Sequence, residues 1–136
     1  MRESMGIEAS FLAGRSSAAT KVDFSGGWKN QRGSSMELSV DDRGRVSGTF
    51  RTAVGVPSAP ESFPLCGFVL GDLIAFTVSF GVHESVTAWA GQHTIVGGRE
   101  RIETLWHLAK NIPDADEERG LWAAVLAGAD GFERRR

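Results

Sequence analysis

Short stretches of alternating apolar and polar residues, each ended by turn-forming residues, are what most limits the folds open to this chain. Residues 36–40 alternate with period two, residues 41–44 break the pattern, and residues 46–50 resume it, which predicts a β-hairpin. Residues 63–80 are apolar enough to suggest a membrane span, but Gly71-Asp72 near the middle supplies a turn and a charge. We therefore expect two strands there instead of one long apolar segment.

Counted along the chain, such stretches predict about eight short strands. The later strands are expected at residues 85–94, 102–108 and 121–132, with a turn at residues 96–99. Glycine supplies turn geometry and aromatic residues suit a pleated surface, so 17 glycines and 8 phenylalanines beside only 4 prolines agree with an all-β fold. An eight-stranded antiparallel up-and-down β-barrel is favoured over a sandwich, because closure removes the unpaired edges of the sheet.

The 136 residues are enough for one buried core and too few for two. Residues 1–22 are rich in Ser, Ala, Gly and charge without sustained periodicity, so they are interpreted as a flexible N-terminal segment. The barrel is expected over residues 23–133, and residues 134–136 are interpreted as a solvated basic tail. No apolar run in residues 1–22 is longer than Phe11-Leu12-Ala13, so no cleavable leader is visible.

The composition argues against several classes of function. A formal net charge of -2 gives no general attraction to nucleic acid, and no membrane span is expected once residues 63–80 are split. Cys66 is the only cysteine, which excludes an intrachain disulfide, and we expect it to be a small buried apolar residue. His83, His93 and His107 lack the paired spacing of a zinc site and are expected at the surface or an interface. No nucleophile is paired with a base and no phosphate loop is present, so we expect no enzyme, no cofactor and no bound metal.

Three predicted strands place hydroxyl groups and aromatic rings on the same face. A dry core would not normally mix several hydroxyls with its aromatic rings, because an unpaired buried polar group costs free energy. The pattern favours an interior that holds a small ligand with a polar end. The residues that share these faces are Ser85, Thr87 and Trp89, then Thr104, Trp106 and Leu108, then Phe50 and Thr52.

Six motifs in this order and at these intervals resemble those of the avidin and streptavidin family. They are GWKNQRGS at residues 27–34, VSGTFRTAVG at 46–55, FTVSF at 76–80, TAWAGQ at 87–92, RIETLW at 101–106, and the segment from Trp122 through Asp130 to Phe132. The resemblance covers about residues 23–133. It implies an eight-stranded barrel that holds biotin, without catalysis, inside each subunit of a homo-oligomer.

The resemblance also implies roles for polar residues around the ureido ring of biotin. Asn30 and Ser34 match two donors to the ureido oxygen, Asp130 matches the acceptor for one ureido N–H, and Thr52 matches the acceptor for the other. Such an arrangement polarises the urea and strengthens the hydrogen bonds opposite the carboxylate. The remaining implied polar contacts are Thr87 near the ring sulfur, and Ser85 with the loop of residues 53–56, including Val54 and Val56, at the valerate carboxylate.

The apolar walls implied by the resemblance are Phe80, Trp89, Trp106 and Leu108, and Trp122 matches a residue that covers the pocket of a neighbouring subunit. One departure is informative, because the family usually places a tyrosine hydroxyl where this chain has Phe50. We expect the missing donor to cost about 1 to 3 kcal/mol of binding free energy unless water substitutes. Phe80, where many members have tryptophan, offers less contact area.

Partners and location follow from the same resemblance. Biotin is the expected ligand, with a homotetramer expected and a dimer possible, and relatives suggest a secreted or periplasmic protein. Two alternatives stay open on the residues alone. One is a barrel of this fold whose pocket, changed at Phe50 and Phe80, binds another small apolar ligand. The other is a structural oligomer with a filled interior.

Overall fold

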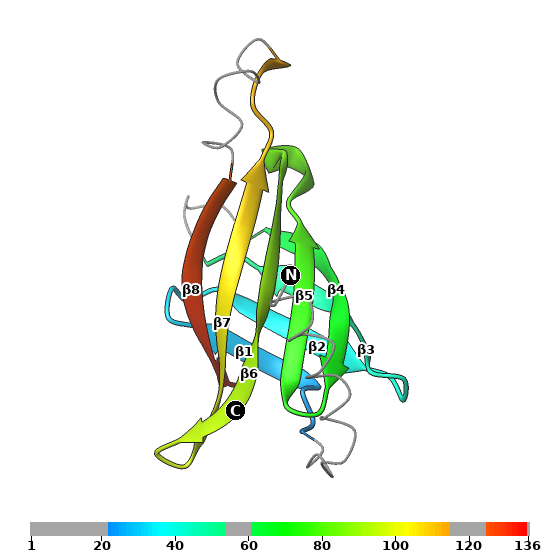
Figure 1. Ribbon diagram of the computed structural model, residues 1–136, viewed down its shortest axis with the longest axis vertical. Helices are drawn as coiled ribbons and strands as arrows, with labels where there is room; N and C mark the ends of the chain where they lie inside the picture. The colour runs from blue at the N-terminus through cyan, green and yellow to red at the C-terminus, as the bar shows by residue number, and fades with distance from the viewer. Residues whose placement is uncertain (1–21, 54–60, 115–124, 136) are drawn as a thin grey trace, which may run out of the picture.

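Eight antiparallel strands closed into a barrel make up the computed structural model, which describes residues 22–53, 61–114 and 125–135 (Figure 1). Each strand pairs with the next along the chain, and the last pairs with the first, so no sheet edge is left open. The predicted up-and-down β-barrel is confirmed. The strands are β1 Gly26–Asn30, β2 Ser35–Val40, β3 Arg45–Arg51, β4 Ser62–Leu70, β5 Leu73–Ser79, β6 Ser85–Val96, β7 Arg99–Lys110 and β8 Val125–Arg134.

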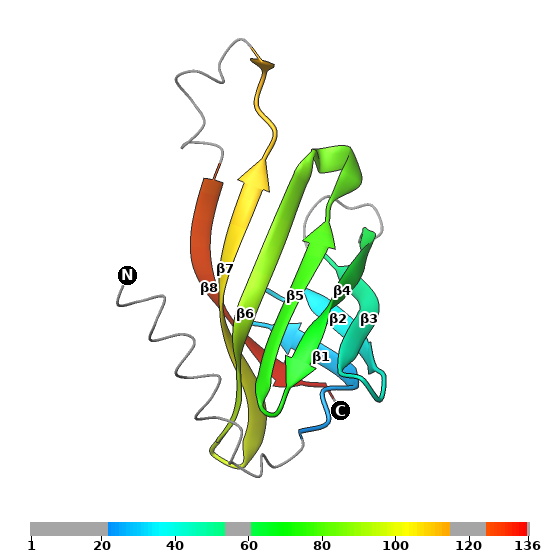
Figure 2. The same cartoon turned by 45° about the vertical axis from the view of Figure 1, so that its right-hand side comes forward.

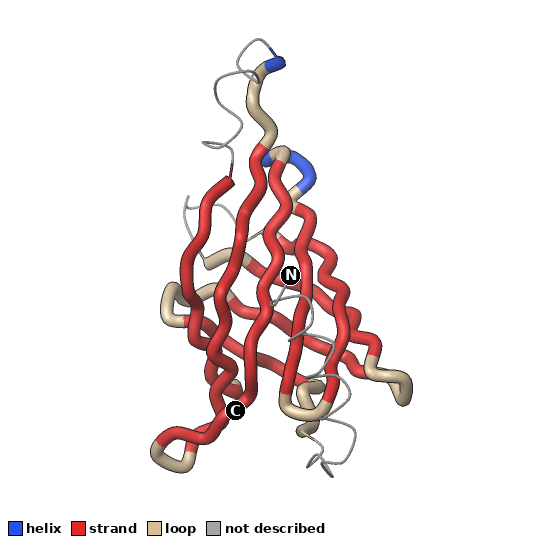
Figure 3. The backbone as a smooth tube through the Cα atoms, viewed as in Figure 1, coloured by secondary structure: helices blue, strands red, loops and turns tan. Residues whose placement is uncertain are grey.

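The connections follow the turn signals in the sequence. The predicted hairpin is β2 and β3, and its turn is held by Asp41, whose carboxylate Oδ1 accepts the backbone N–H groups of Arg43 and Arg45 at 2.8 and 2.9 Å. The apolar segment does divide into β4 and β5 at Gly71-Asp72. A short 3-10 helix, η1 (Gly81–His83), joins β5 to β6 (Figure 3). The paired ends of β6 and β7 extend beyond the neighbouring strands as a long hairpin (Figure 2).

Alternation along each strand separates an apolar interior from the outer surface. The strand β5 shows the pattern clearly, with Ile74, Phe76 and Val78 buried and Leu73 and Ala75 exposed. Aromatic rings make up a large part of this interior. The largest fully buried side chains are Trp28, Phe24, Phe132, Met36, Ile102 and Val78.

Arg134 corrects the interpretation of the terminal arginines as a solvated tail. It is the last residue of β8 and pairs with Trp28 of β1, so it takes part in closing the barrel. Its guanidinium donates to the Glu100 carboxylate at 2.9 Å and to the carbonyl of Ser25 at 2.7 Å, and it lies 4.2 Å from the Trp28 ring centroid. The carbonyl of Asp23 is a third acceptor for the same guanidinium. With three acceptors and an aromatic ring as partners, Arg134 has a structural role.

Two further expectations are wrong. Cys66 is exposed, because it lies on the outward-facing register of β4. The His93 side chain is only 10% exposed, packs edge-on against the Phe24 and Trp28 rings, and hydrogen-bonds Glu100 through Nε2 at 2.9 Å. Its place at the end of the barrel core could not be predicted from spacing alone. Within the described ranges, no helix has the length and hydropathy needed to cross a membrane.

Candidate functional site

The end of β1 and the turn that follows it form the first part of the site. Asn30, the last residue of β1, is 7% exposed. Its Oδ1 accepts the backbone N–H groups of Arg32 and Ser34 at 3.0 and 2.9 Å, which shapes the turn. No hydrogen bond within the described residues uses its Nδ2 group. The turn therefore orients Asn30 so that its amide N–H groups remain as donors.

Asp130 on β8 supplies a buried carboxylate to the same region. It is 5% exposed, and its Oδ2 accepts the indole N–H of Trp89 at 2.9 Å. Its backbone carbonyl accepts the Thr104 hydroxyl at 2.9 Å. Arg32 adds a cation, with Nε 3.9 Å from Oδ1. A buried carboxylate fixed in this way has lone pairs left for the N–H group of a ligand.

Gln31 holds the turn against β8 and was not predicted as a site residue. Its Nε2 donates to Asp130 Oδ1 at 3.0 Å and to the carbonyl of Ala129 at 3.3 Å. Its Oε1 accepts the backbone N–H of Gly131 at 3.0 Å. The two segments are a hundred positions apart in the sequence, so only the closure of β1 onto β8 could reveal this contact.

Aromatic rings form the apolar part of the interior. Trp89 stacks on Phe76 with ring centroids 4.9 Å apart, and Phe50 lies 5.2 Å from it on a second side. Phe80 packs edge-on against Phe50 at 5.9 Å and against Phe63 at 4.8 Å. Phe63 and Phe76 were not predicted as site residues. They support the walls from β4 and β5, since aromatic pairs prefer such tilted and stacked contacts.

The strand register brings together most of the remaining predicted residues. Thr87 is buried and pairs with Leu108 across β6 and β7, and Trp89 pairs with Trp106. Ser85 lies at the start of β6 and is half-buried.

Two further predicted residues lie around the β3–β4 connection. The Ser34 hydroxyl accepts the backbone N–H of Ala53 at 3.3 Å, and half-buried Thr52 donates its backbone N–H to the carbonyl of Glu61 at 3.1 Å. Ser34 and Thr52 are thus held close to the loop that follows β3. The predictions for Val54, Val56 and Trp122 lie outside the described residues.

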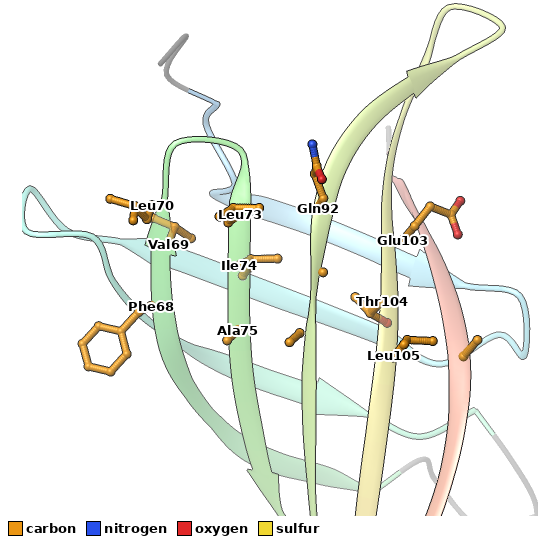
Figure 4. Close-up of a pocket in the computed structure, with 13 residues that line it drawn as sticks. Phe68, Val69, Leu70, Leu73, Ile74, Ala75, Gln92, Glu103, Thr104 and Leu105 are labelled. Carbon is orange, nitrogen blue, oxygen red and sulfur yellow. The ribbon is translucent and has the colours of Figure 1, made fainter. Parts of the chain in front are cut away.

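A separate hollow of about 760 Å³ lies on the outer surface, over β4 to β7 (Figure 4). Phe68, Leu70, Leu73 and Leu105 point to this side and are exposed. The hollow contains none of the residues predicted to contact a ligand. It is therefore a feature of the outer wall, distinct from the interior site.

A closed antiparallel barrel with aromatic walls and a fixed buried carboxylate has the features of barrels that bind one small molecule. The comparisons with known proteins make the class specific, because the model of the avidin family matches residues 18–135. This chain belongs to the avidin family.

Individual relatives agree with that assignment. Avidin of Gallus gallus is 32% identical over 128 residues, which cover 88% of this chain and 82% of avidin. The crystal structure of Xenavidin superposes with a TM-score of 0.73 at 30% identity, over 85% of this chain and all (100%) of Xenavidin. A rhizavidin–biotin complex superposes with a TM-score of 0.68 at 33% identity, over 84% of this chain and 93% of rhizavidin. The resemblance found in the sequence motifs is thereby confirmed.

Proposed function

We propose that this protein binds biotin inside its barrel, without catalysing a reaction and without a cofactor. The observation that carries the proposal is the buried Asp130 carboxylate, fixed by Trp89 and Gln31 on the strand next to β1. Asn30 ends β1, and its Nδ2 donates no hydrogen bond within the described part of the chain. A cyclic urea presents one acceptor and two N–H donors, which is the complement of this set. The likeness to a rhizavidin–biotin complex supports the same ligand.

In this proposal the residues divide by chemistry. Asn30 and Ser34 donate to the ureido oxygen, and Asp130 and Thr52 accept from the ureido N–H groups. The bicyclic ring lies against apolar walls, and the carboxylate tail points to the β3–β4 connection and the start of β6. The wall and tail residues are Phe50, Phe80, Thr87, Trp89, Trp106 and Leu108, then Val54, Val56 and Ser85.

The affinity is proposed to be high but below that of relatives with a third donor to the ureido oxygen. Phe50 is 4% exposed and packs on the rings of Trp89 and Phe80. A phenylalanine ring has no hydrogen-bond donor, so this position supplies none to the ureido oxygen. One missing hydrogen bond to a polarised acceptor corresponds to about one to two decades in Kd.

Exposed apolar residues on the outer surface of the barrel are the basis for proposing self-association. Phe68, Leu70 and Leu105 are 67%, 71% and 67% exposed on one face, and apolar patches of this kind mark interfaces. We propose that a second copy of the chain covers this face and that the assembly is a homotetramer, with Trp122 reaching a neighbouring subunit's pocket. Export to the periplasm or outside the cell is proposed from the family membership alone.

Titration calorimetry with biotin, followed by native mass spectrometry of the same sample, tests the proposal. The expected result is one biotin per chain with submicromolar Kd, in an assembly of four chains. Binding weaker than micromolar, or a different bound mass in untreated protein, would contradict biotin as the ligand. Desthiobiotin, which keeps the urea, and a carbon-chain acid of similar length, which lacks it, serve as matched ligands. Only desthiobiotin should bind if the polar residues of the site recognise the urea.

A further inference from the structure

The two tryptophans that face each other across β6 and β7 are held in different ways. Trp89 donates its indole N–H to Asp130 at 2.9 Å, so a hydrogen bond sets the orientation of its ring. Among the described residues, Trp106 Nε1 is the buried side-chain polar atom that has no hydrogen-bond partner. No hydrogen bond among these residues fixes the direction of the indole, so its orientation depends on what packs against it.

The shape that accommodates Trp106 is provided by Gly128. The two residues pair across β7 and β8, and the indole lies over the glycine. A Cβ added at Gly128 would lie 2.3 Å from Trp106 Cζ2, 2.6 Å from Cε2 and 3.1 Å from Cη2. Carbon atoms in contact normally stay about 3.5 to 4.0 Å apart, so any side chain here would displace the ring.

Gly128 also lies close to the polar end of the proposed site. It is two residues before Asp130, and side chains two apart on a strand share a face. A ring laid over Gly128 is thus a wall immediately beside the carboxylate. Arg32 also reaches this ring, with its guanidinium carbon 5.7 Å from the Trp106 centroid and its Nε 3.9 Å from Asp130.

We propose that Gly128 is a positioning residue for ligand binding: its missing side chain is the space that lets the Trp106 indole lie flat beside Asp130 as a wall of the site. The inference rests on the proposed binding of a cyclic urea. It assigns Gly128 a role that depends on Trp106 and is separate from any effect on β8 itself.

The test is a double-mutant cycle measured by biotin titration, with Gly128→Ala made in the wild-type chain and in Trp106→Phe. A phenylalanine ring lacks the distant indole atoms that the new methyl group would meet. We expect Gly128→Ala to raise the biotin Kd about tenfold or more in the wild type, and less than about threefold in Trp106→Phe. An equal rise in both backgrounds would show that Gly128 acts through the β8 backbone and would overturn the inference.

Gly81→Ala is the matched control, because a Cβ at Gly81 would meet nothing within 4 Å. It should leave both the biotin Kd and the thermal unfolding midpoint unchanged. A ligand-free measurement separates this inference from the proposed function. Gly128→Ala should change the near-ultraviolet circular dichroism of tryptophan in the wild type and not in Trp106→Phe. If that change is absent, the inference fails even if biotin binds; if it is present and biotin does not bind, only the proposed function fails.

Discussion

Asp130 shows how a single residue depends on the closure of the barrel. Its carboxylate is buried, yet it accepts hydrogen bonds from Trp89 on β6 and from Gln31 in the turn after β1. Burying an ion without such donors would be strongly unfavourable. The two donors offset that penalty and hold the oxygens in place before a ligand arrives, so less conformational freedom is lost on binding.

The isosteric change Asp130→Asn tests the importance of the charge. It removes the negative charge and places an amide N–H₂ opposite other donors, so the polarised hydrogen bonds to a urea are lost. We expect biotin affinity to fall about ten- to a hundredfold in titration calorimetry. Asp42→Asn, an exposed turn residue between β2 and β3, is the control and should bind as the wild type does. Similar affinities for the two variants would rule out a charge-assisted contact at Asp130.

Phe50→Tyr tests the opposite change, the gain of a donor. The ring is buried between Trp89 and Phe80, and a hydroxyl group would add one hydrogen bond to the ureido oxygen. The expected result is a biotin Kd lower by about one to two decades, seen as slower dissociation in a competition assay. Phe63→Tyr, a second buried phenylalanine that packs on Phe80, should give no such gain. An unchanged dissociation rate in Phe50→Tyr would mean that the missing donor does not limit affinity.

At the scale of the strands, one ion cluster ties β8 to β7 and to residues 23–25, which precede β1. Arg134 and His93 both hydrogen-bond the Glu100 carboxylate, and the guanidinium of Arg134 also reaches the carbonyl of Ser25. The hydrogen bond from Arg134, and then that from His93, lower the pKa of Glu100 from 4.5 to about 2. A carboxyl group with a depressed folded-state pKa stabilises the fold above its unfolded pKa.

That contribution is fully present above about pH 4.5 and is lost as the pH falls toward 2. Glu100→Gln should therefore unfold with a flatter pH dependence over this range, measured as urea midpoints at stepped pH. At neutral pH the loss should stay below about 1 kcal/mol, because the Glu100 side chain is 39% exposed and solvent screens the pair. Glu37 is an exposed carboxylate on β2, and Glu37→Gln should show the same loss of stability at low pH as the wild type. If the urea midpoints of Glu100→Gln and the wild type fall equally as the pH is lowered, this cluster is not the source of the acid dependence of stability.

The strands themselves were predictable because alternation and turn chemistry are local. Asp41 and the Gly71-Asp72 pair act within a few residues, and the sequence placed both turns correctly. The errors concern contacts that exist only after closure. Arg134 was taken as a tail because its acceptors lie on β7 and near the other end of the chain, and Gln31 was missed for the same reason.

The same difference between local patterns and contacts formed on closure applies to the candidate site. The motifs predicted ligand contacts for Asn30, Thr87 and Asp130, and the fold buries all three. They could not identify Gly128, since a glycine has no chemistry of its own and its role depends on which ring lies across it. Cys66 shows the converse limit, because burial preferences of a residue type do not reveal which face of a strand it occupies.

For the whole molecule, the outer wall is the feature that a single barrel does not explain. The interior already buries its aromatic residues, yet Phe68, Leu70, Leu73 and Leu105 remain exposed over β4 to β7 around a shallow hollow (Figure 4). Leaving them in water forgoes about 25 cal/mol for each Å² of apolar surface that a partner could cover. A copy of the same chain offers the same face, and a two-fold axis would bring two such apolar faces into contact.

Leu105→Glu tests this account, because the side chain points outward from β7 and a charge there would be desolvated between two copies. We expect the variant to keep the wild-type circular dichroism while its mass, measured by light scattering at matched concentration, falls to a smaller assembly or to the monomer. Val82→Glu is the control: Val82 is 79% exposed on η1, outside the apolar face, so the same charge should leave the mass unchanged. If both variants keep the wild-type mass, the face over β4 to β7 is not where copies meet. If both lose mass alike, the effect belongs to the added charge and not to this face.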